Sequence, residues 1–177
     1  MTTTWTAPTV DRHEPDRIAS ERLALEQWLD YQRDTLLTKC AGLTAEQLKT
    51  RPVPPSGLSL LGLVRHMVEV ERWWFRTNAG SQDIGNVYCT EDDEDADFDG
   101  VDDADAAADL ETYRREVQAA RVAVAGKRLD DLVASPGHHP ERTRDIRWIY
   151  VHMIEEYARH NGHADLIRER IDGVTGD

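Results

Sequence analysis

The sequence predicts an all-α protein: a four-helix bundle with a long acidic crossover loop between its second and third helices. Four long segments repeat apolar residues at helical spacing, whereas no segment alternates apolar and polar residues as a half-buried strand does. Internal repeats are also absent, which favours a simple bundle. The 177 residues are enough for a sizeable core. We therefore expect one domain over residues 1–177, with residues 1–13 as a loose N-terminal segment.

The first helix is expected to begin near Pro15, because proline suits the first turn of a helix, and to end at Gly42. Thr44 and Gln47 have the spacing of a capping box and predict a short helix that ends near Lys49. Three prolines then forbid a continuing helix. The predicted inward face of the first helix comprises Ile18, Leu25, Trp28, Leu29, Leu36 and Cys40.

The second long helix is expected to follow Ser59 as its N-cap and to run to about Asn78. The third should start at Asp103 or Asp105, where negative charge suits a helix N-terminus, and stop at Gly126. The predicted inward residues of these two helices are Leu60, Leu63, Val64, Met67, Val70, Trp74, Leu110, Tyr113, Val117, Ala120 and Val124.

The fourth helix is expected from about Arg144 to Gly173, after a turn-rich segment. That segment carries His138 and His139, which we interpret as an exposed pair. The two cysteines, Cys40 and Cys89, form neither a disulfide framework nor a CxxC pair. Cys40 is expected to pack in the core, and Cys89 to lie in a loop.

The net charge of −13 comes from one segment. Thirteen Asp or Glu residues and no Lys or Arg lie between Asp83 and Glu111, and the remaining 34 − 13 = 21 acids balance the 21 bases. This charge argues against nucleic acid as a partner, because phosphate binding needs clustered cations. The acidic run also lacks the spacing of a calcium-binding loop. We expect Glu91 to Asp103 to be a mobile, solvated connection outside the core.

The sequence also bears on location and assembly. It contains no apolar run that could cross a bilayer, and its first residues lack the features of a signal peptide. We therefore expect a cytoplasmic protein with no membrane partner. A homodimer, with Trp5, Trp73 and Trp74 covering its seam, is one alternative to a core or pocket-wall role for these aromatic residues.

The fourth helix carries a row of polar residues among its apolar ones. His152, Glu156 and His160 recur every four residues and therefore share a helix face, which His163 adjoins. Buried polar groups without a partner are costly, and a metal ion would satisfy them together. The alternative is that these are hydrogen-bonded core histidines. The second helix offers a further ligand, His66, on its inward side.

Bundles build metal sites from side chains on facing helices. His66, Glu156 and His160 supply two imidazoles and a carboxylate, a set that suits a divalent cation with open positions. Zn²⁺ is the expected metal, and Fe²⁺ or Ni²⁺ are alternatives. His152 and His163 would then be extra ligands or would contact the ligands.

The stretches LSLLGLVRHMVEVERWWF and WIYVHMIEEYARHNGHADLIRE resemble the DinB superfamily of metal-binding four-helix bundles. They are most similar to the branch near the mycothiol-dependent maleylpyruvate isomerases. The family's first ligand, a histidine of the second helix, corresponds to His66. In this branch a glutamate and a histidine four residues apart follow in the fourth helix, and these match Glu156 and His160. A glycine two residues later matches Gly162, whereas His163 stands where many members have glutamine.

The resemblance, which covers about residues 18–173, implies a metal-dependent transfer reaction. A low-molecular-weight thiol such as mycothiol would be one substrate and an electrophilic small molecule the other. A cation lowers the pKa of a thiol, and the thiolate is its reactive form, which agrees with this role. Two other functions compete with it: a non-catalytic, stress-responsive metal-binding bundle, and a metallohydrolase with Glu155 or His163 as its base. No catalytic or substrate-binding residue is assigned beyond these.

Overall fold

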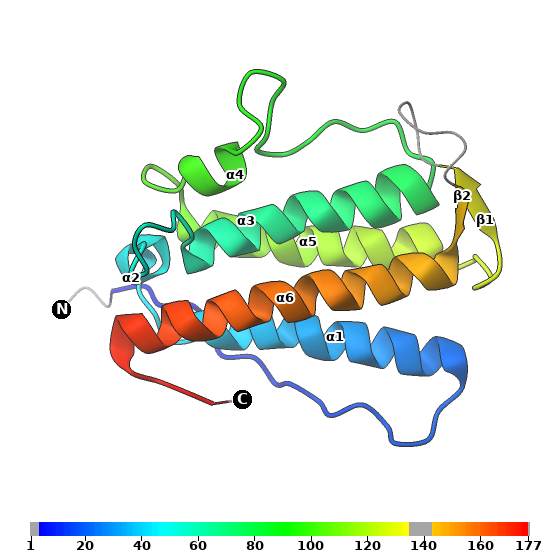
Figure 1. The fold of residues 1–177 in the computed structure, drawn as a ribbon, viewed down its shortest axis with the longest axis horizontal. Coiled ribbons are helices and arrows are strands. Elements are labelled where there is room, and N and C mark those ends of the chain that lie inside the picture. The colour runs from blue at the N-terminus through cyan, green and yellow to red at the C-terminus, as the bar shows by residue number, and fades with distance from the viewer. Residues whose placement is uncertain (1–3, 135–142, 177) are drawn as a thin grey trace.

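The computed structural model describes residues 4–134 and 143–176, and within them the protein is all-α, as predicted (Figure 1). A small hairpin accompanies the helices. The long helical elements are α1 (Glu21–Cys40), α3 (Leu60–Glu71) with its π-helical continuation η1 (Arg72–Ala79), α5 (Ala106–Val124) and α6 (Ile146–Asp172). The short elements are α2 (Ala45–Lys49), α4 (Ala96–Asp99), β1 (Leu132–Ala134) and β2 (Thr143–Asp145).

The long helices lie roughly along one axis and form a bundle (Figure 1). Helices α1 and α6 run in one direction, and α3 and α5 run in the opposite one. Because α3 and α5 are parallel, the segment between η1 and α5 returns along the bundle as a crossover and carries α4 on its way. This topology places acidic residues over the outer side of α3.

Side-chain caps set the beginnings of α2, α3 and α5 at residues that the sequence indicates. Ser59 accepts a hydrogen bond from the amide of Gly62, and Asp105 accepts from Ala107 and Ala108. Thr44 forms the predicted capping box with Gln47. At the other end of α6, Gly173 has a φ of 78°, the left-handed conformation that commonly terminates a helix.

The start and the inner face of α1 differ from the prediction. The helix begins at Glu21 rather than near Pro15, because Ser20 supplies its N-cap. Ile18 therefore precedes the helix and is 95% exposed, and Trp28 is 48% exposed. The face toward the core contains Leu29 and, unexpectedly, Arg33.

The acidic segment is not wholly outside the core, and this expectation was wrong. Asp97 and Val101 are buried, with 3% and 0% of their surfaces exposed. Phe98 of α4 packs on α3, where a Cβ at Gly62 would lie 3.1 Å from its ring. By contrast, the acids of residues 91–95 are exposed. The segment thus has an exposed part and a packed part.

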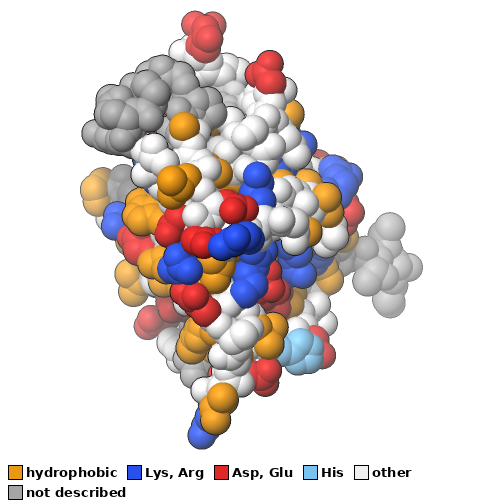
Figure 2. Space-filling model, turned by 90° about the vertical axis from the view of Figure 1, so that its right-hand side faces the viewer, with side chains coloured by type: hydrophobic (Ala, Val, Ile, Leu, Met, Phe, Trp, Pro, Cys, Tyr) orange, Lys and Arg blue, Asp and Glu red, His pale blue; other side chains and the backbone are white. Residues whose placement is uncertain are grey.

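The hairpin of β1 and β2 was not predicted. It pairs Leu132 with Asp145 and Ala134 with Thr143, and three residues a strand are too few for a recognisable alternation. Figure 2 views the end of the bundle at which the hairpin lies, where acidic and basic side chains mix without a patch of one sign. His138 and His139 lie outside the described residues.

Part of the N-terminal segment, which we expected to be loose, is buried against the bundle and hydrogen-bonded to it. Ala7 is 3% exposed, its amide donates to the carbonyl of Leu43, and its carbonyl accepts from Gly42. No described helix is both long enough and apolar enough to cross a membrane.

Candidate metal centre

The polar row of α6 is present as predicted on one face of the helix. Glu156 lies between two histidines: its Oε1 is 3.5 Å from Nε2 of His152, and its Oε2 is 3.6 Å from Nε2 of His160. The rings of His160 and His163 follow, with centroids 5.4 Å apart. The carboxylate of Glu156 could therefore bind one metal ion together with either His152 or His160.

His66 meets this row from α3. Its ring centroid lies 4.8 Å from that of His160, so imidazoles from two helices converge beside Glu156. His66 has a second contact through Nδ1, which is 2.8 Å from Oδ2 of Asp97. All the predicted site residues thus lie in one connected cluster.

His160 has the properties of a neutral metal ligand. Burial, together with the neighbouring His66 and His163, lowers the pKa of its imidazole to about 4. At neutral pH the ring is therefore uncharged and keeps a lone pair for a ligand. In the described part of the chain, the buried Nδ1 atoms of His160 and His163 have no hydrogen-bond partner. Such orphaned nitrogens fit a site that a cation completes.

A second grouping shares Glu156. His152, Glu155 and Glu156 each offer one ligand atom, and these atoms lie within 4.8 Å of one another. Glu155 is 49% exposed and pairs with Arg159, however, so it is the most solvated member of either group. His66 and His160 are less exposed and come from different helices. Two imidazoles and a carboxylate are a donor set that a divalent cation accepts, so His66, Glu156 and His160 fit one by their chemistry, whereas His152, Glu155 and Glu156 already have their ligand atoms close together.

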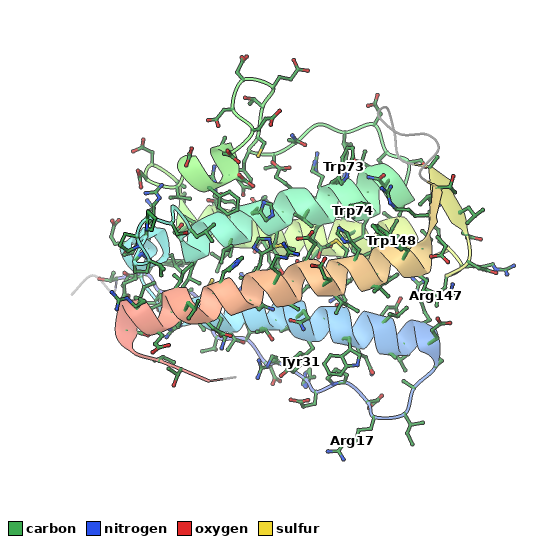
Figure 3. All side chains as sticks on the ribbon, viewed as in Figure 1. Arg17, Tyr31, Trp73, Trp74, Arg147 and Trp148 are labelled. Atoms are coloured by element: carbon green, nitrogen blue, oxygen red, sulfur yellow. The ribbon has the colours of Figure 1, made fainter. Side chains whose placement is uncertain are left out.

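A cavity of about 770 Å³ opens beside His66. Its apolar walls are Val70, Trp73, Trp74 and Phe98. Figure 3 shows Trp74 and Trp148 between η1 and α6, and their rings are 5.4 Å apart. His152 stacks on Trp148 at 4.9 Å, which connects the polar row with the aromatic wall. The acidic residues that line the cavity are Glu69, Glu91, Glu94, Asp95 and Asp97.

Neither cysteine has the properties of a reactive nucleophile. Cys89 lines the cavity, but burial and the nearby charges of Asp97 and Glu69 raise the pKa of its thiol to about 11. Burial raises the pKa of Cys40 to about 12, and this residue packs in the core as predicted. A thiolate is the reactive form, so both side chains are poor nucleophiles at neutral pH.

A buried polar network connects the long helices, and two of its residues, Glu71 and Tyr157, lie on the helices that carry the candidate ligands. Arg33 of α1 donates two hydrogen bonds of 2.7 Å to the carboxylate of Glu71 on α3. Tyr157, which adjoins Glu156 on α6, donates to the same carboxylate, and its hydroxyl also contacts that of Tyr113 on α5. The network therefore joins all the long helices next to the candidate ligands.

Sequence reasoning missed three residues of this region: Asp97, Glu71 and Glu69. Glu69 accepts hydrogen bonds from the amides of three consecutive residues, Val87 to Cys89, and so fixes the cavity loop. A signal for Asp97 exists in the sequence, since Phe98 and Val101 are apolar and three residues apart within the acidic run. No comparable signal marks Glu71.

Bundles build metal sites from side chains on facing helices, and this bundle brings histidine and glutamate side chains together from α3 and α6. The sequence model of the family described as Mycothiol-S-transferase matches residues 24–173. The chain therefore belongs to the mycothiol S-transferase family, a DinB-like family. Among curated proteins, no relative matches it.

Proposed function

We propose that this protein is a metal-dependent transferase that joins a low-molecular-weight thiol of the mycothiol type to an electrophilic small molecule. One observation carries the proposal: His66 meets His160 and Glu156 beside an aromatic-walled cavity. Family membership supports the choice of thiol. The cavity is large enough to admit a small molecule.

In this proposal His66, Glu156 and His160 hold the cation. Zn²⁺ is the expected ion because two imidazoles and one carboxylate are a common catalytic set for it, and Fe²⁺ or Ni²⁺ are alternatives. When bound, a divalent cation lowers the pKa of a nearby thiol and so raises its thiolate fraction. The neutral state of His160 agrees with a ligand role, because a protonated imidazole has no lone pair to give.

The cavity residues orient the second substrate. Trp73, Trp74 and Phe98 offer apolar faces that bind a flat molecule and exclude water near His66. With a conjugated carbonyl acceptor, the thiol sulfur forms a bond to the β-carbon while the carbon–carbon π bond breaks. The proton that the thiol loses is balanced by one gained at the α-carbon, so no leaving group is needed.

The test is cobalt substitution followed by addition of thiol. A Co–thiolate bond gives a charge-transfer band that cobalt bound only by nitrogen and oxygen lacks. Mycothiol is tried first, then glutathione, bacillithiol and cysteine, all without dithiothreitol. The Cys40→Ser, Cys89→Ser double variant is the matched control, and it should give the same band because neither protein thiol is the ligand.

A thiol that produces the band should also be consumed in turnover with a conjugated acceptor such as N-ethylmaleimide. If no thiol at millimolar concentration changes the spectrum, the transferase proposal fails. Unfolding upon metal removal would then favour a structural ion, and hydrolytic turnover would favour a metallohydrolase.

A further inference from the structure

We propose that Asp97 is a positioning residue that presents one ring nitrogen of His66 to the metal. The inference rests on the proposed function, since it assigns a role toward the cation held by His66. The central contact is the 2.8 Å distance between Oδ2 of Asp97 and Nδ1 of His66. A carboxylate can only accept a hydrogen bond, so Nδ1 carries the proton and Nε2 keeps its lone pair.

Asp97 is held in place independently of any ligand. Its Oδ1 accepts from the amide of Phe98 at 3.0 Å, so both carboxylate oxygens have partners. Arg65, which adjoins His66 on α3, donates to the carbonyls of Ala96 and Asp97 at 2.9 and 3.0 Å. The backbone of α4 is therefore fastened to α3 next to the histidine that Asp97 contacts.

Phe98 fixes the plane of the same imidazole. Its ring stacks on that of His66 with a centroid distance of 4.9 Å and an interplanar angle of 27°. The absence of a side chain at Gly62 makes room for this ring, because a Cβ there would lie 3.1 Å from it. Asp97 thus sets the tautomer of His66, and Phe98 limits its rotation.

A carboxylate behind a metal-bound histidine typically contributes tenfold to a hundredfold in metal affinity. Burial strengthens the hydrogen bond between Asp97 and His66. Asp97 is only 3% exposed, so water competes little with its carboxylate for the proton on Nδ1 of His66. The acidic crossover therefore supplies Asp97, which orients a candidate metal ligand, as well as negative charge.

The experiment compares Asp97→Asn with Asp99→Asn, an exposed residue of the same short helix whose substitution removes the same charge. Metal affinity is measured by competition with a chromogenic chelator, using Zn²⁺ and Co²⁺. We expect Asp97→Asn to bind tenfold to a hundredfold more weakly than Asp99→Asn, which should match the wild type. Asp97→Glu retains the carboxylate and should recover part of the loss.

A second measurement does not involve the metal. Long-range proton–nitrogen spectra of the metal-free protein, labelled with ¹⁵N-histidine, report the tautomer of His66. The wild type and Asp99→Asn should carry the proton on Nδ1. Asp97→Asn should shift it toward Nε2, because an amide can donate to Nδ1. A merely structural pair would change the melting temperature without changing metal affinity.

The outcomes separate the two proposals. A wild-type protein that binds no metal overturns the proposed function and this inference with it. A wild type that binds metal, with an Asp97→Asn variant that binds as tightly as Asp99→Asn, overturns this inference alone. The same holds if His66 of the wild type carries its proton on Nε2. If Asp97→Asn does not fold, the wild-type tautomer and the Asp97→Glu affinity provide the decision.

Discussion

The histidines of the candidate centre differ in what holds them. His66 is fixed by Asp97 and Phe98, and His152 by stacking on Trp148. The buried Nδ1 of His160, by contrast, has no hydrogen-bond partner among the described residues. These differences make the roles of the side chains separable by single substitutions.

His66→Ala and His160→Ala should each lose most of the bound metal, because each removes one of three proposed ligands. His152→Ala should retain it if the centre is formed by His66, Glu156 and His160. Metal content is measured by elemental analysis of protein purified without chelators. His13→Ala, which changes an 83% exposed histidine, is the control. Loss of metal in His152→Ala alone would favour the group of His152, Glu155 and Glu156.

The thiol of Cys89 should react slowly with iodoacetamide at neutral pH. Its raised pKa of about 11 means that only a small fraction is thiolate at pH 8. The labelling rate should therefore rise about tenfold for each pH unit, as the Henderson–Hasselbalch relation requires, and level off only near the raised pKa. Mass spectrometry of the Cys40→Ser variant follows this residue alone. A rate that levels off near pH 8.5 would contradict the assigned environment.

At the scale of single elements, the junction of α3 and η1 matters most. Glu71 ends α3, is fully buried and accepts from both Arg33 and Tyr157. Directly after it, η1 adopts π-helical geometry and carries Trp73 and Trp74 to the cavity. π-helical turns are often found at functional sites. The buried ion pair and the cavity wall are therefore consecutive along the chain.

Glu71→Gln should destabilise the fold by about 3 kcal/mol, because it removes the buried carboxylate that pairs with Arg33 and leaves that guanidinium only the part-exposed Asp30 as a charged partner. Urea unfolding should show a lower midpoint with an unchanged slope. The control is Glu21→Gln, which breaks the exposed pair with Arg147 and should leave the midpoint nearly unchanged. Equal effects of the two substitutions would show that the buried pair is not a structural anchor.

The two parts of the acidic segment should respond differently to substitution. Val101→Ala should cost about 2 kcal/mol, because Val101 is fully buried beside α4. The double change Asp92→Asn, Asp93→Asn affects only exposed residues and should leave the melting temperature unchanged. Thermal unfolding of the two variants provides the comparison. Equal melting temperatures of the two variants would show that Val101 contributes no more to stability than the exposed acids, as expected if the whole acidic segment lay outside the core.

The elements whose signals are local were predictable from the sequence. Caps such as Ser59 and Asp105, and the four-residue spacing on α6, depend on neighbours in the chain. The burial of Arg33 was not predictable, because it depends on Glu71, which is distant in sequence. For Asp97, the apolar Phe98 and Val101 indicate that the segment packs, but they do not identify His66 as its partner. Charged residues in an acidic run or on a helix normally face water, and only tertiary contacts reverse that expectation.

At the scale of the whole molecule, the distribution of charge determines what approaches the cavity. The net charge of −13 originates in the crossover, and five acidic residues of that side line the cavity. No Lys or Arg is among the described residues of its lining. A low-dielectric cleft with one sign of charge focuses the field and attracts counter-charged molecules.

A cationic electrophile should therefore have a higher kcat/KM than a matched anionic one, by on the order of tenfold at low ionic strength. Maleimides that carry a trimethylammonium or a sulfonate group make a suitable pair, and N-ethylmaleimide is the neutral reference. The ratio should shrink between about 0.01 and 0.15 M salt as screening increases. The double variant Glu91→Gln, Glu94→Gln should also reduce it. A ratio that does not depend on salt would show that the field does not select the substrate.

The separation of His66 from Glu156 and His160 along the chain has a consequence for biosynthesis. Helix α3 leaves the ribosome long before α6, and during that interval it can pack only against the elements that precede α6, which include α4 and α5. His66 therefore lacks Glu156 and His160 beside it until α6 has been translated and has packed into the bundle. Under the proposed ligand set, an ion could be captured only at the end of folding. Bound metal would then distinguish completely folded molecules from chains in which α6 has not yet packed.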